Sequence, residues 1–164
     1  MHLEKDQFRQ LVEYGVLFSI DLVLLDNQNR ILLGKRINSP AQGYWFVPGG
    51  RVYKNEPLSQ AFKRICQCEL GCEFDYHQAW LLGLYDHFYE DSVFGNDIST
   101  HYVNAPYLIK LNKVKLDSLP KQQHRDYRWQ NINKIEQDDS VHKYSKVFLH
   151  ALKQHIDEDK VKRA

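Results

Sequence analysis

The chain has 164 residues, of which 22 are Lys or Arg and 21 are Asp or Glu, so its formal net charge is only +1. A charge this small excludes the basic surface expected of a protein that binds nucleic acid or an anionic membrane. The length fits one domain, which we expect over residues 1–156, followed by a charged and frayed tail over 157–164. The N-terminus lacks a signal-peptide pattern and no apolar run could span a bilayer, so we expect a cytoplasmic protein.

The N-terminal part of the chain alternates between strand patterns and turns. The apolar run that begins at Leu17 is followed by Asp26-Asn27-Gln28-Asn29, which favours a turn, and by a second apolar run, so this pair predicts a β-hairpin. An aromatic run then ends at Pro48-Gly49-Gly50. The elements predicted here are a helix over 5–14, strands over 17–25, 30–35 and 44–47, and a loop over 39–43.

The helix that follows Gly50 has clear signals at both ends. Pro57 suits the first turn, and Glu56 lies where a negative charge meets the positive end of the helix dipole. Gly71 suits the position just after the last helical residue. The apolar face of this helix is predicted to contain Leu58, Ala61, Phe62, Ile65 and Leu70.

The remaining chain predicts more strands and a terminal helix. Two long strands are expected over 79–89 and 99–111, on either side of the loop 91–97, and a last strand near 127–129. A helix around 145–155 follows. Helices that flank a mixed sheet predict an α/β or α+β sandwich.

Three cysteines lie close together at Cys66, Cys68 and Cys72. An odd number with this spacing is a poor disulfide framework. Cys66 and Cys68 would point about 200° apart on a helix, which is unsuitable for one zinc ion. We therefore expect small buried apolar side chains.

The spacing from Gly50 to Gly71 resembles the Nudix signature. Five residues separate Gly50 from Glu56, seven separate Glu56 from Arg64, and Glu69 precedes Gly71 by two. In that family a glycine-started loop and helix carry Glu, Arg, further Glu residues and a closing Gly. The resemblance implies a Nudix-type α/β/α sandwich with a mixed central sheet and a diphosphate substrate.

The resemblance also implies a metal site. Mg²⁺ prefers oxygen ligands and binds through one or two carboxylates together with phosphate oxygens. A backbone carbonyl of Gly49 or Gly50 and the Glu69 carboxylate are the ligands expected here, with Mn²⁺ as a substitute metal. Glu56 and Arg64 are expected to support the site, since Arg64 can hold or neutralise carboxylates.

Two positions depart from the Nudix signature. The residue after Arg64 is Ile65 where the family has Glu, and Cys68 replaces the first of two consecutive Glu residues, leaving Glu69 alone. Fewer carboxylates imply fewer bound metal ions and remove the base that normally activates water in the helix. Either the enzyme is inactive or its catalytic groups lie outside this helix.

A second resemblance accounts for these departures. The chain is similar to the GDP-mannose mannosyl hydrolases, a divergent branch of the Nudix family that lacks the same glutamates. The similarity covers the chain up to about His142. It is carried by Gly34-Lys35-Arg36, by the run from Pro40 to Val52, by His87-Phe88-Tyr89, by Thr100-His101-Tyr102-Val103 and by Gln123-His124 with Asp126-Tyr127-Arg128-Trp129.

This resemblance implies a reaction at the sugar carbon. That family releases GDP and mannose with inversion, and the terminal phosphate of GDP is a weak base with a pKa of about 6, so charge neutralisation suffices for its departure. Water must attack from the opposite face, which needs a base away from the metal helix. By resemblance, that base is His124, and Gln123 is a neutral metal ligand. The diphosphate is expected to contact Arg36, Arg51 and Tyr102. The sugar or the departing charge is expected to lie near Asp21 and His87. A homodimer is also implied.

Several alternatives remain open at this stage. The substrate could be another nucleoside-diphosphate hexose such as GDP-glucose, the attack could occur at phosphorus as in ordinary Nudix pyrophosphatases, or the chain could be a binding protein. Tyr102 could be a strand residue with a hydrated hydroxyl, while Asp21 and His87 could have purely structural roles in the core. His101 is given no role, and surface positions are predicted for His2, His77, His142, His150 and His155.

Overall fold

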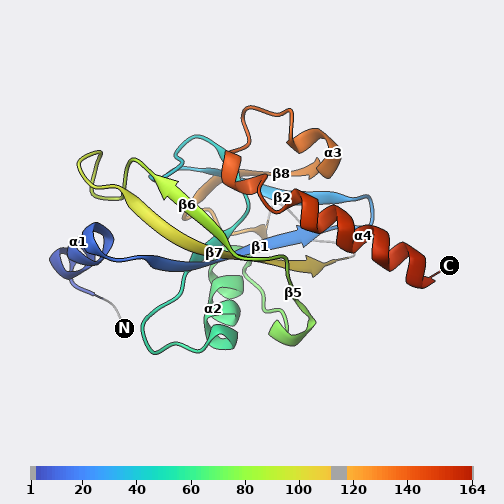
Figure 1. Cartoon of the computed structure of the whole chain (residues 1–164), viewed down its shortest axis with the longest axis horizontal. Helices are drawn as coiled ribbons and strands as arrows, with labels where there is room; N and C mark the ends of the chain where they lie inside the picture. The colour runs from blue at the N-terminus through green and yellow to red at the C-terminus, as the bar shows by residue number, and fades with distance from the viewer. Residues whose placement is uncertain (1–2, 112–117, 164) are drawn as a thin grey trace.

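A computed structural model describes residues 3–111 and 118–163 of the chain, and its strands form one mixed sheet with helices on both faces (Figure 1). Among these residues, no helix has the length and apolar character needed to cross a membrane. The described elements are α1 Lys5–Tyr14, β1 Leu17–Leu25, β2 Arg30–Arg36, β3 Trp45–Phe46, β4 Gly49–Arg51, α2 Leu58–Leu70, η1 Tyr76–Gln78, β5 Trp80–Leu81, β6 Tyr85–Tyr89, β7 Thr100–Lys110, β8 His124–Asn131, α3 Ile132–Ile135, η3 Lys143–Ser145 and α4 Leu149–Arg163.

Strand β1 lies at the centre of the sheet and organises it. The order is β3-β2-β1-β7-β5, with β4 paired to β1, β6 to β7 and β8 to β2. β1 runs parallel to β7, with Leu17 opposite Tyr102 and Leu25 opposite Lys110, whereas the other pairs are antiparallel. The sheet is therefore mixed, as predicted.

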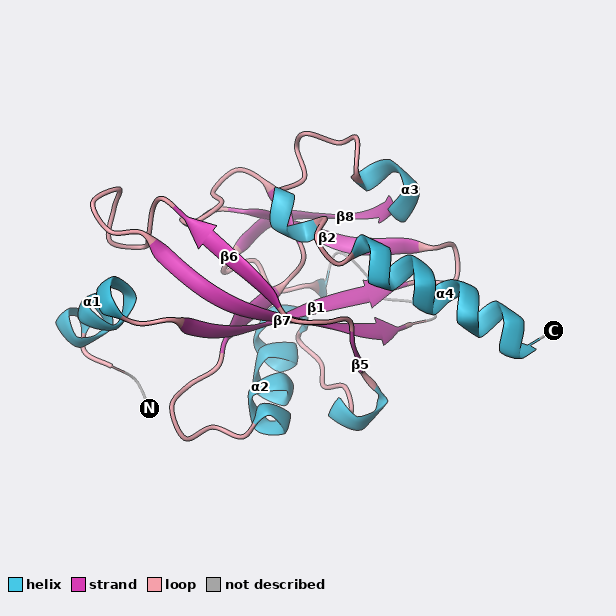
Figure 2. Ribbon diagram, in the orientation of Figure 1, coloured by secondary structure: helices cyan, strands magenta, loops and turns pink. Residues whose placement is uncertain are grey.

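Both faces of β1 are buried, which explains its almost uninterrupted apolar sequence. Leu22 and Leu24 point to the face covered by α2, where they pack in one core with Phe62. Val23 and Leu25 point to the opposite face and belong to the core that includes α4. Figure 2 shows these two helices on opposite sides of the sheet, so the predicted α/β/α sandwich is confirmed.

The strand expected near 127–129 is longer, at His124–Asn131, and the strand expected over 44–47 is shorter, at Trp45–Phe46. Two further differences in extent have a clear physical cause. The strand expected over 79–89 is divided into β5 and β6, because Gly83 between them has a φ of +136°, a conformation that interrupts an extended strand. The terminal helix begins at Leu149 and continues to Arg163. The expectation of a frayed tail over 157–163 is therefore wrong; Lys110 on β7 bonds to Asp159 and helps to hold this part of the helix, while residue 164 lies outside the described range.

The loop between β4 and α2 is held by a bidentate ion pair. Arg64 donates from Nε to Glu56 Oε1 at 2.6 Å and from a terminal nitrogen to Oε2 at 2.7 Å. The same nitrogen reaches the Arg51 carbonyl oxygen at 2.8 Å, and the Tyr53 N–H donates to Glu56 at 3.0 Å. The two predicted support residues thus fix the backbone that leads away from Gly50.

We predict that this pair stabilises the fold by an amount that depends on pH. The Arg64 guanidinium lowers the pKa of Glu56 below its ordinary value of 4.5. The contribution should therefore be complete above pH 4.5 and be lost as the pH falls through the lower pKa of the folded state. A double-mutant cycle of Glu56→Gln and Arg64→Gln, measured by urea unfolding, should give a coupling of roughly 1–2 kcal/mol at pH 7.

The matched control is the exposed pair of Lys63 and Glu73, whose atoms lie 3.0 Å apart. Its coupling should be below about 0.5 kcal/mol because solvent screens it. A coupling between Glu56 and Arg64 that is equally small at pH 7 would contradict the prediction.

Candidate functional site

A cleft of about 690 Å³ opens beside the central strands and gathers many of the predicted site residues. They come from six different segments of the chain: β4 and β2 pair with β1, β7 pairs with β1 and β6, and β8 pairs with β2. The predicted residues that line the cleft are Asp21, Arg36, Gly49, Gly50, Arg51, His87, Tyr102 and Gln123.

Two arginines supply the positive charge of the cleft. Arg36 at the end of β2 donates from Nε to the Pro40 carbonyl oxygen at 2.9 Å. The guanidinium carbon of Arg51 lies 4.0 Å from the centre of the Phe8 ring, so α1 contributes an aromatic surface beneath this charge. Guanidinium groups can donate two parallel hydrogen bonds to a phosphate, so these side chains suit a phosphorylated ligand.

Asp21 on β1 lies in the wall of the cleft beneath the glycine loop. A Cβ atom on Gly49 would lie only 2.4 Å from Asp21 Oδ1, so this position requires glycine. Asp21 is 5% exposed, and burial raises its pKa to about 7, against the opposing effects of Asn104 and Arg36. Its Oδ2 atom has no hydrogen-bond partner among the described residues, which leaves it as an acceptor for a bound ligand.

His87 and Tyr102 face each other across the β6–β7 pair. Burial, together with the nearby His142, lowers the pKa of His87 to about 4, so its imidazole is neutral at pH 7. Burial raises the pKa of Tyr102, and its hydroxyl therefore keeps its proton. These two residues offer neutral hydrogen-bonding groups beside the arginines.

A second cluster joins the end of α2 to the start of β8, and its Gln123 also lines the cleft. The Gln123 amide nitrogen donates to Glu69 Oε1 at 2.7 Å, and His124 Nδ1 lies 3.5 Å from Glu69 Oε2. Burial raises the pKa of Glu69 to about 7 and lowers the pKa of His124 to about 4. At neutral pH the histidine is uncharged, so this contact is not a complete ion pair.

The predicted base, His124, does not line the cleft in this structure. It is 1% exposed, and its Nε2 atom has no hydrogen-bond partner among the described residues. Its ring packs against Gly34, where a Cβ atom would lie 2.4 Å from His124 Cδ2. Gly34 is therefore a site residue that the sequence reasoning missed, although a glycine inside a strand is a signal of close approach.

The Glu69 cluster has the chemistry to hold a hard cation. The carboxylate is 4% exposed and receives a hydrogen bond from a neutral amide, so an added positive charge would offset the cost of its burial. Within 3–111 and 118–163, no three side chains of His, Cys, Asp or Glu gather to hold a metal ion. A cation here would need the Gln123 amide oxygen and backbone carbonyls besides Glu69, which are ligands that Mg²⁺ and Mn²⁺ accept.

Two groups of predictions about burial need correction. His142 is half-buried, because it stacks on Phe46 and Tyr89 with ring centres 5.3 and 5.6 Å apart. Among the other histidines predicted at the surface, His77 and His150 are exposed, His155 is half-buried against Trp80, and His2 lies outside the described residues. Of the three cysteines only Cys66 is buried. Cys68 lies off the apolar face of α2 and Cys72 lies beyond the end of this helix, and both are exposed.

Comparison with known proteins identifies the family. A family model described as the NUDIX domain matches residues 17–152. The low-salt glycan biosynthesis protein Agl8 of Haloferax volcanii is 38% identical over 112 residues, which cover 68% of this chain and 70% of that protein.

Solved structures share the fold at lower sequence identity. A MutT NUDIX hydrolase from Burkholderia pseudomallei has a TM-score of 0.65 and 24% identity, over 84% of this chain and 98% of that one. The NUDIX domain of Shewanella oneidensis NrtR, solved in complex with ADP ribose, has a TM-score of 0.60 and 17% identity, over 94% and 99% of the two chains. The chain therefore belongs to the NUDIX domain family of hydrolases.

Proposed function

We propose that this protein is a Mg²⁺-dependent hydrolase of a nucleoside-diphosphate sugar, with GDP-mannose as the preferred substrate. Water attacks the anomeric carbon with inversion, and the products are GDP and mannose. The observation that carries the proposal is the cluster of Glu69, Gln123 and His124, in which one carboxylate of the family helix meets an amide and an imidazole from another part of the chain.

The altered helix supports attack at carbon over attack at phosphorus. At the two positions where the family usually has Glu, Ile65 is 1% exposed within the core and Cys68 points to solvent. Neither residue can bind a metal beside Glu69 or act as a base there. With Glu69 assigned to the metal, the base that activates water would come from outside α2. The name of the Haloferax relative, which refers to glycan biosynthesis, is consistent with a sugar-containing substrate.

The leaving group would be stabilised by the arginines of the cleft. Arg36 and Arg51 would neutralise the charge that develops on the terminal phosphate, while the Tyr102 hydroxyl donates a hydrogen bond to it. Mg²⁺ or Mn²⁺, when bound by Glu69, Gln123 and a carbonyl of Gly49 or Gly50, would supply further positive charge to the diphosphate.

Two residues compete for the role of base. His124 is neutral, and its buried Nε2 atom has no hydrogen-bond partner among the described residues, so its action as base would require a local rearrangement that admits water. Asp21 already lines the cleft, with Oδ2 unpartnered within the described structure. We assign the base to His124 and a sugar contact to Asp21. The homodimer implied by resemblance stays a prediction.

The first experiment is product analysis with GDP-mannose and Mg²⁺ in ¹⁸O-labelled water. We expect the label in mannose, unlabelled GDP, and an inverted anomeric configuration in the initial product by NMR. Labelled phosphate with GMP and mannose 1-phosphate would show ordinary attack at phosphorus. Turnover of GDP-glucose but not of GDP-mannose would assign a different sugar to the substrate. If no nucleotide sugar is hydrolysed, the result would favour a binding protein.

Replacing the proposed base should slow the chemical step. His124→Gln is expected to lower kcat by about 10²–10⁴-fold, the usual contribution of a general base, with bound Mn²⁺ retained. His77→Gln is the matched control, since His77 is exposed and is not among the residues that line the cleft, and the kcat of this variant should stay within about twofold of the wild type. A larger loss in Asp21→Asn than in His124→Gln would assign the base to Asp21.

Removing the buried carboxylate should weaken the binding of metal. In Glu69→Gln the amide cannot supply a negative charge, so we expect Mn²⁺ affinity, measured by electron paramagnetic resonance, to fall about tenfold or more. The control is Glu73→Gln, which changes an exposed carboxylate just beyond the same helix. Equal affinities for both variants would place the metal elsewhere.

A further inference from the structure

Tyr144, in the short helix η3, lies directly behind His87. The two rings are nearly parallel, with centres 4.1 Å apart and planes 10° from each other. Tyr144 is 7% exposed and His87 is 2% exposed. No motif in the sequence pointed to Tyr144, which reaches this position from the C-terminal part of the chain.

The Tyr144 hydroxyl also fixes the backbone next to His87. It accepts a hydrogen bond from the Phe88 N–H at 2.5 Å and donates one to the Phe88 carbonyl oxygen at 2.6 Å. In an antiparallel pair, alternate residues turn both backbone groups away from the partner strand. The Tyr144 hydroxyl therefore provides hydrogen-bond partners for the Phe88 N–H and carbonyl groups, which point away from β7, while its ring packs against the imidazole of His87.

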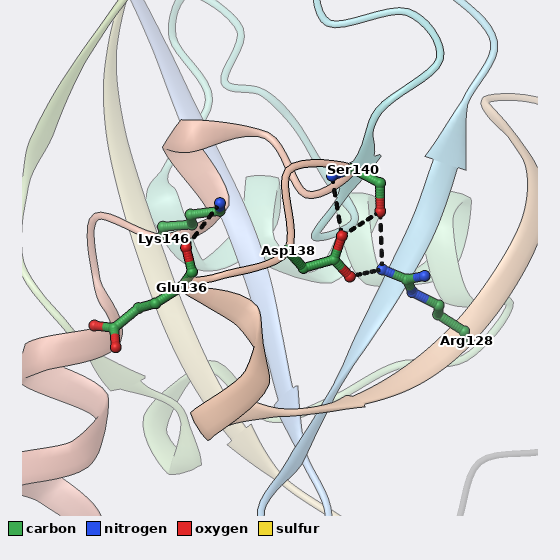
Figure 3. Close-up of polar contacts among 5 residues, drawn as sticks. All are labelled: Arg128, Glu136, Asp138, Ser140 and Lys146. Carbon is green, nitrogen blue, oxygen red and sulfur yellow. Dashed lines mark hydrogen bonds and ion pairs between the residues drawn. The ribbon is translucent and has the colours of Figure 1, made fainter.

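The segment that carries Tyr144 is itself firmly attached. The Trp45 N–H donates to the Ser140 carbonyl oxygen at 2.9 Å, and the His142 N–H donates to the Trp45 carbonyl oxygen at 3.0 Å. Figure 3 shows Asp138 between Arg128 and the backbone and hydroxyl of Ser140. The chain before Tyr144 is thus tied to β3 and to β8.

The imidazole of His87 has few other constraints. Its Nε2 atom is buried without a hydrogen-bond partner among the described residues. The edges of Phe46 and Tyr89 lie farther away, with ring centres 6.4 and 6.2 Å from that of His87. The parallel stack with Tyr144 is accordingly the closest ring contact that sets its orientation toward the cleft.

We propose that Tyr144 is a positioning residue for hydrolysis: it holds the His87 ring and the β6 backbone in the orientation that the bound sugar nucleotide requires. This inference rests on the proposed function, in which His87 contacts the sugar or the departing charge. A misplacement of about 1 Å at such a group can cost roughly 10²-fold in rate. Tyr144 is not among the residues that line the cleft, so its effect on the reaction would pass through its neighbours His87 and Phe88.

Two variants separate the hydroxyl from the ring. Tyr144→Phe keeps the stack and loses both bonds to Phe88, whereas Tyr144→Leu loses the ring as well. The control is Tyr85→Phe on the same strand, which removes a bond from a tyrosine hydroxyl to the Leu82 carbonyl oxygen (3.1 Å) away from the cleft lining. Circular dichroism establishes that each variant is folded.

The readouts are kcat and KM with GDP-mannose and the NMR signals of the His87 ring, assigned with His87→Gln. For Tyr144→Phe we expect kcat to fall roughly fivefold, with KM within about twofold and the ring-current shift of His87 retained. For Tyr144→Leu we expect kcat to fall about 10²-fold and that shift to disappear. Tyr85→Phe should match the wild type in both readouts.

Wild-type kcat in both Tyr144 variants would overturn the proposal, as would unchanged His87 signals in Tyr144→Leu. If Tyr144→Leu does not fold, Tyr144→Phe decides the matter alone: the proposal fails if its kcat equals that of Tyr85→Phe. If the wild type hydrolyses no nucleotide sugar, the proposed function fails, and the NMR signals then show separately whether Tyr144 orients His87.

Discussion

The candidate site is shaped by two buried carboxylates, those of Asp21 and Glu69, that interact with the guanidinium of Arg36. Asp21 and Glu69 lie on different elements, each is almost inaccessible to solvent, and Arg36 favours the charged form of both. Their mutual repulsion contributes to the raised pKa of Asp21. Burying a carboxylate without a compensating positive charge costs free energy, and a bound cation at this site would reduce that cost. In the proposed function this cost in stability is offset when the metal ion and the substrate bind.

The replacement of a family carboxylate by Ile65 changes how the loop and helix are joined. A Cβ atom on Gly50 would lie 3.1 Å from Ile65 Cγ1, so the apolar side chain packs directly beneath the glycine loop. The loop is held on its other side by Arg64, which bonds both to Glu56 and to the Arg51 carbonyl oxygen. The loop and the helix are thus joined with less negative charge than the family signature carries, and Glu69 contacts Gln123 and His124 from outside the helix.

Local patterns were sufficient to predict much of the fold. The apolar run of β1 and the Gly71 cap of α2, with a φ of +69°, were identified correctly because burial and a left-handed cap leave direct marks in the sequence. The division of the strand at Gly83 was missed, since one glycine inside an apolar run is compatible with a continuous strand. The full length of α4 was also missed, because its charged last turns have no apolar periodicity and are held partly by contact with β7.

Site residues that belong to a sequence motif could be predicted, whereas residues that reach the site only through tertiary packing could not. His142 and Tyr144 lie in a polar stretch that suggests a surface loop, yet their rings close the back of the cleft around Phe46 and His87. Burial of each ring, together with Arg36 and, for His142, the nearby Lys143, lowers the pKa values of His124 and His142 to about 4. The imidazoles around the cleft therefore stay neutral at pH 7, and its positive charge comes from guanidinium groups. Neutral imidazoles beside guanidinium groups suit a reaction in which an anion departs while an uncharged base accepts a proton.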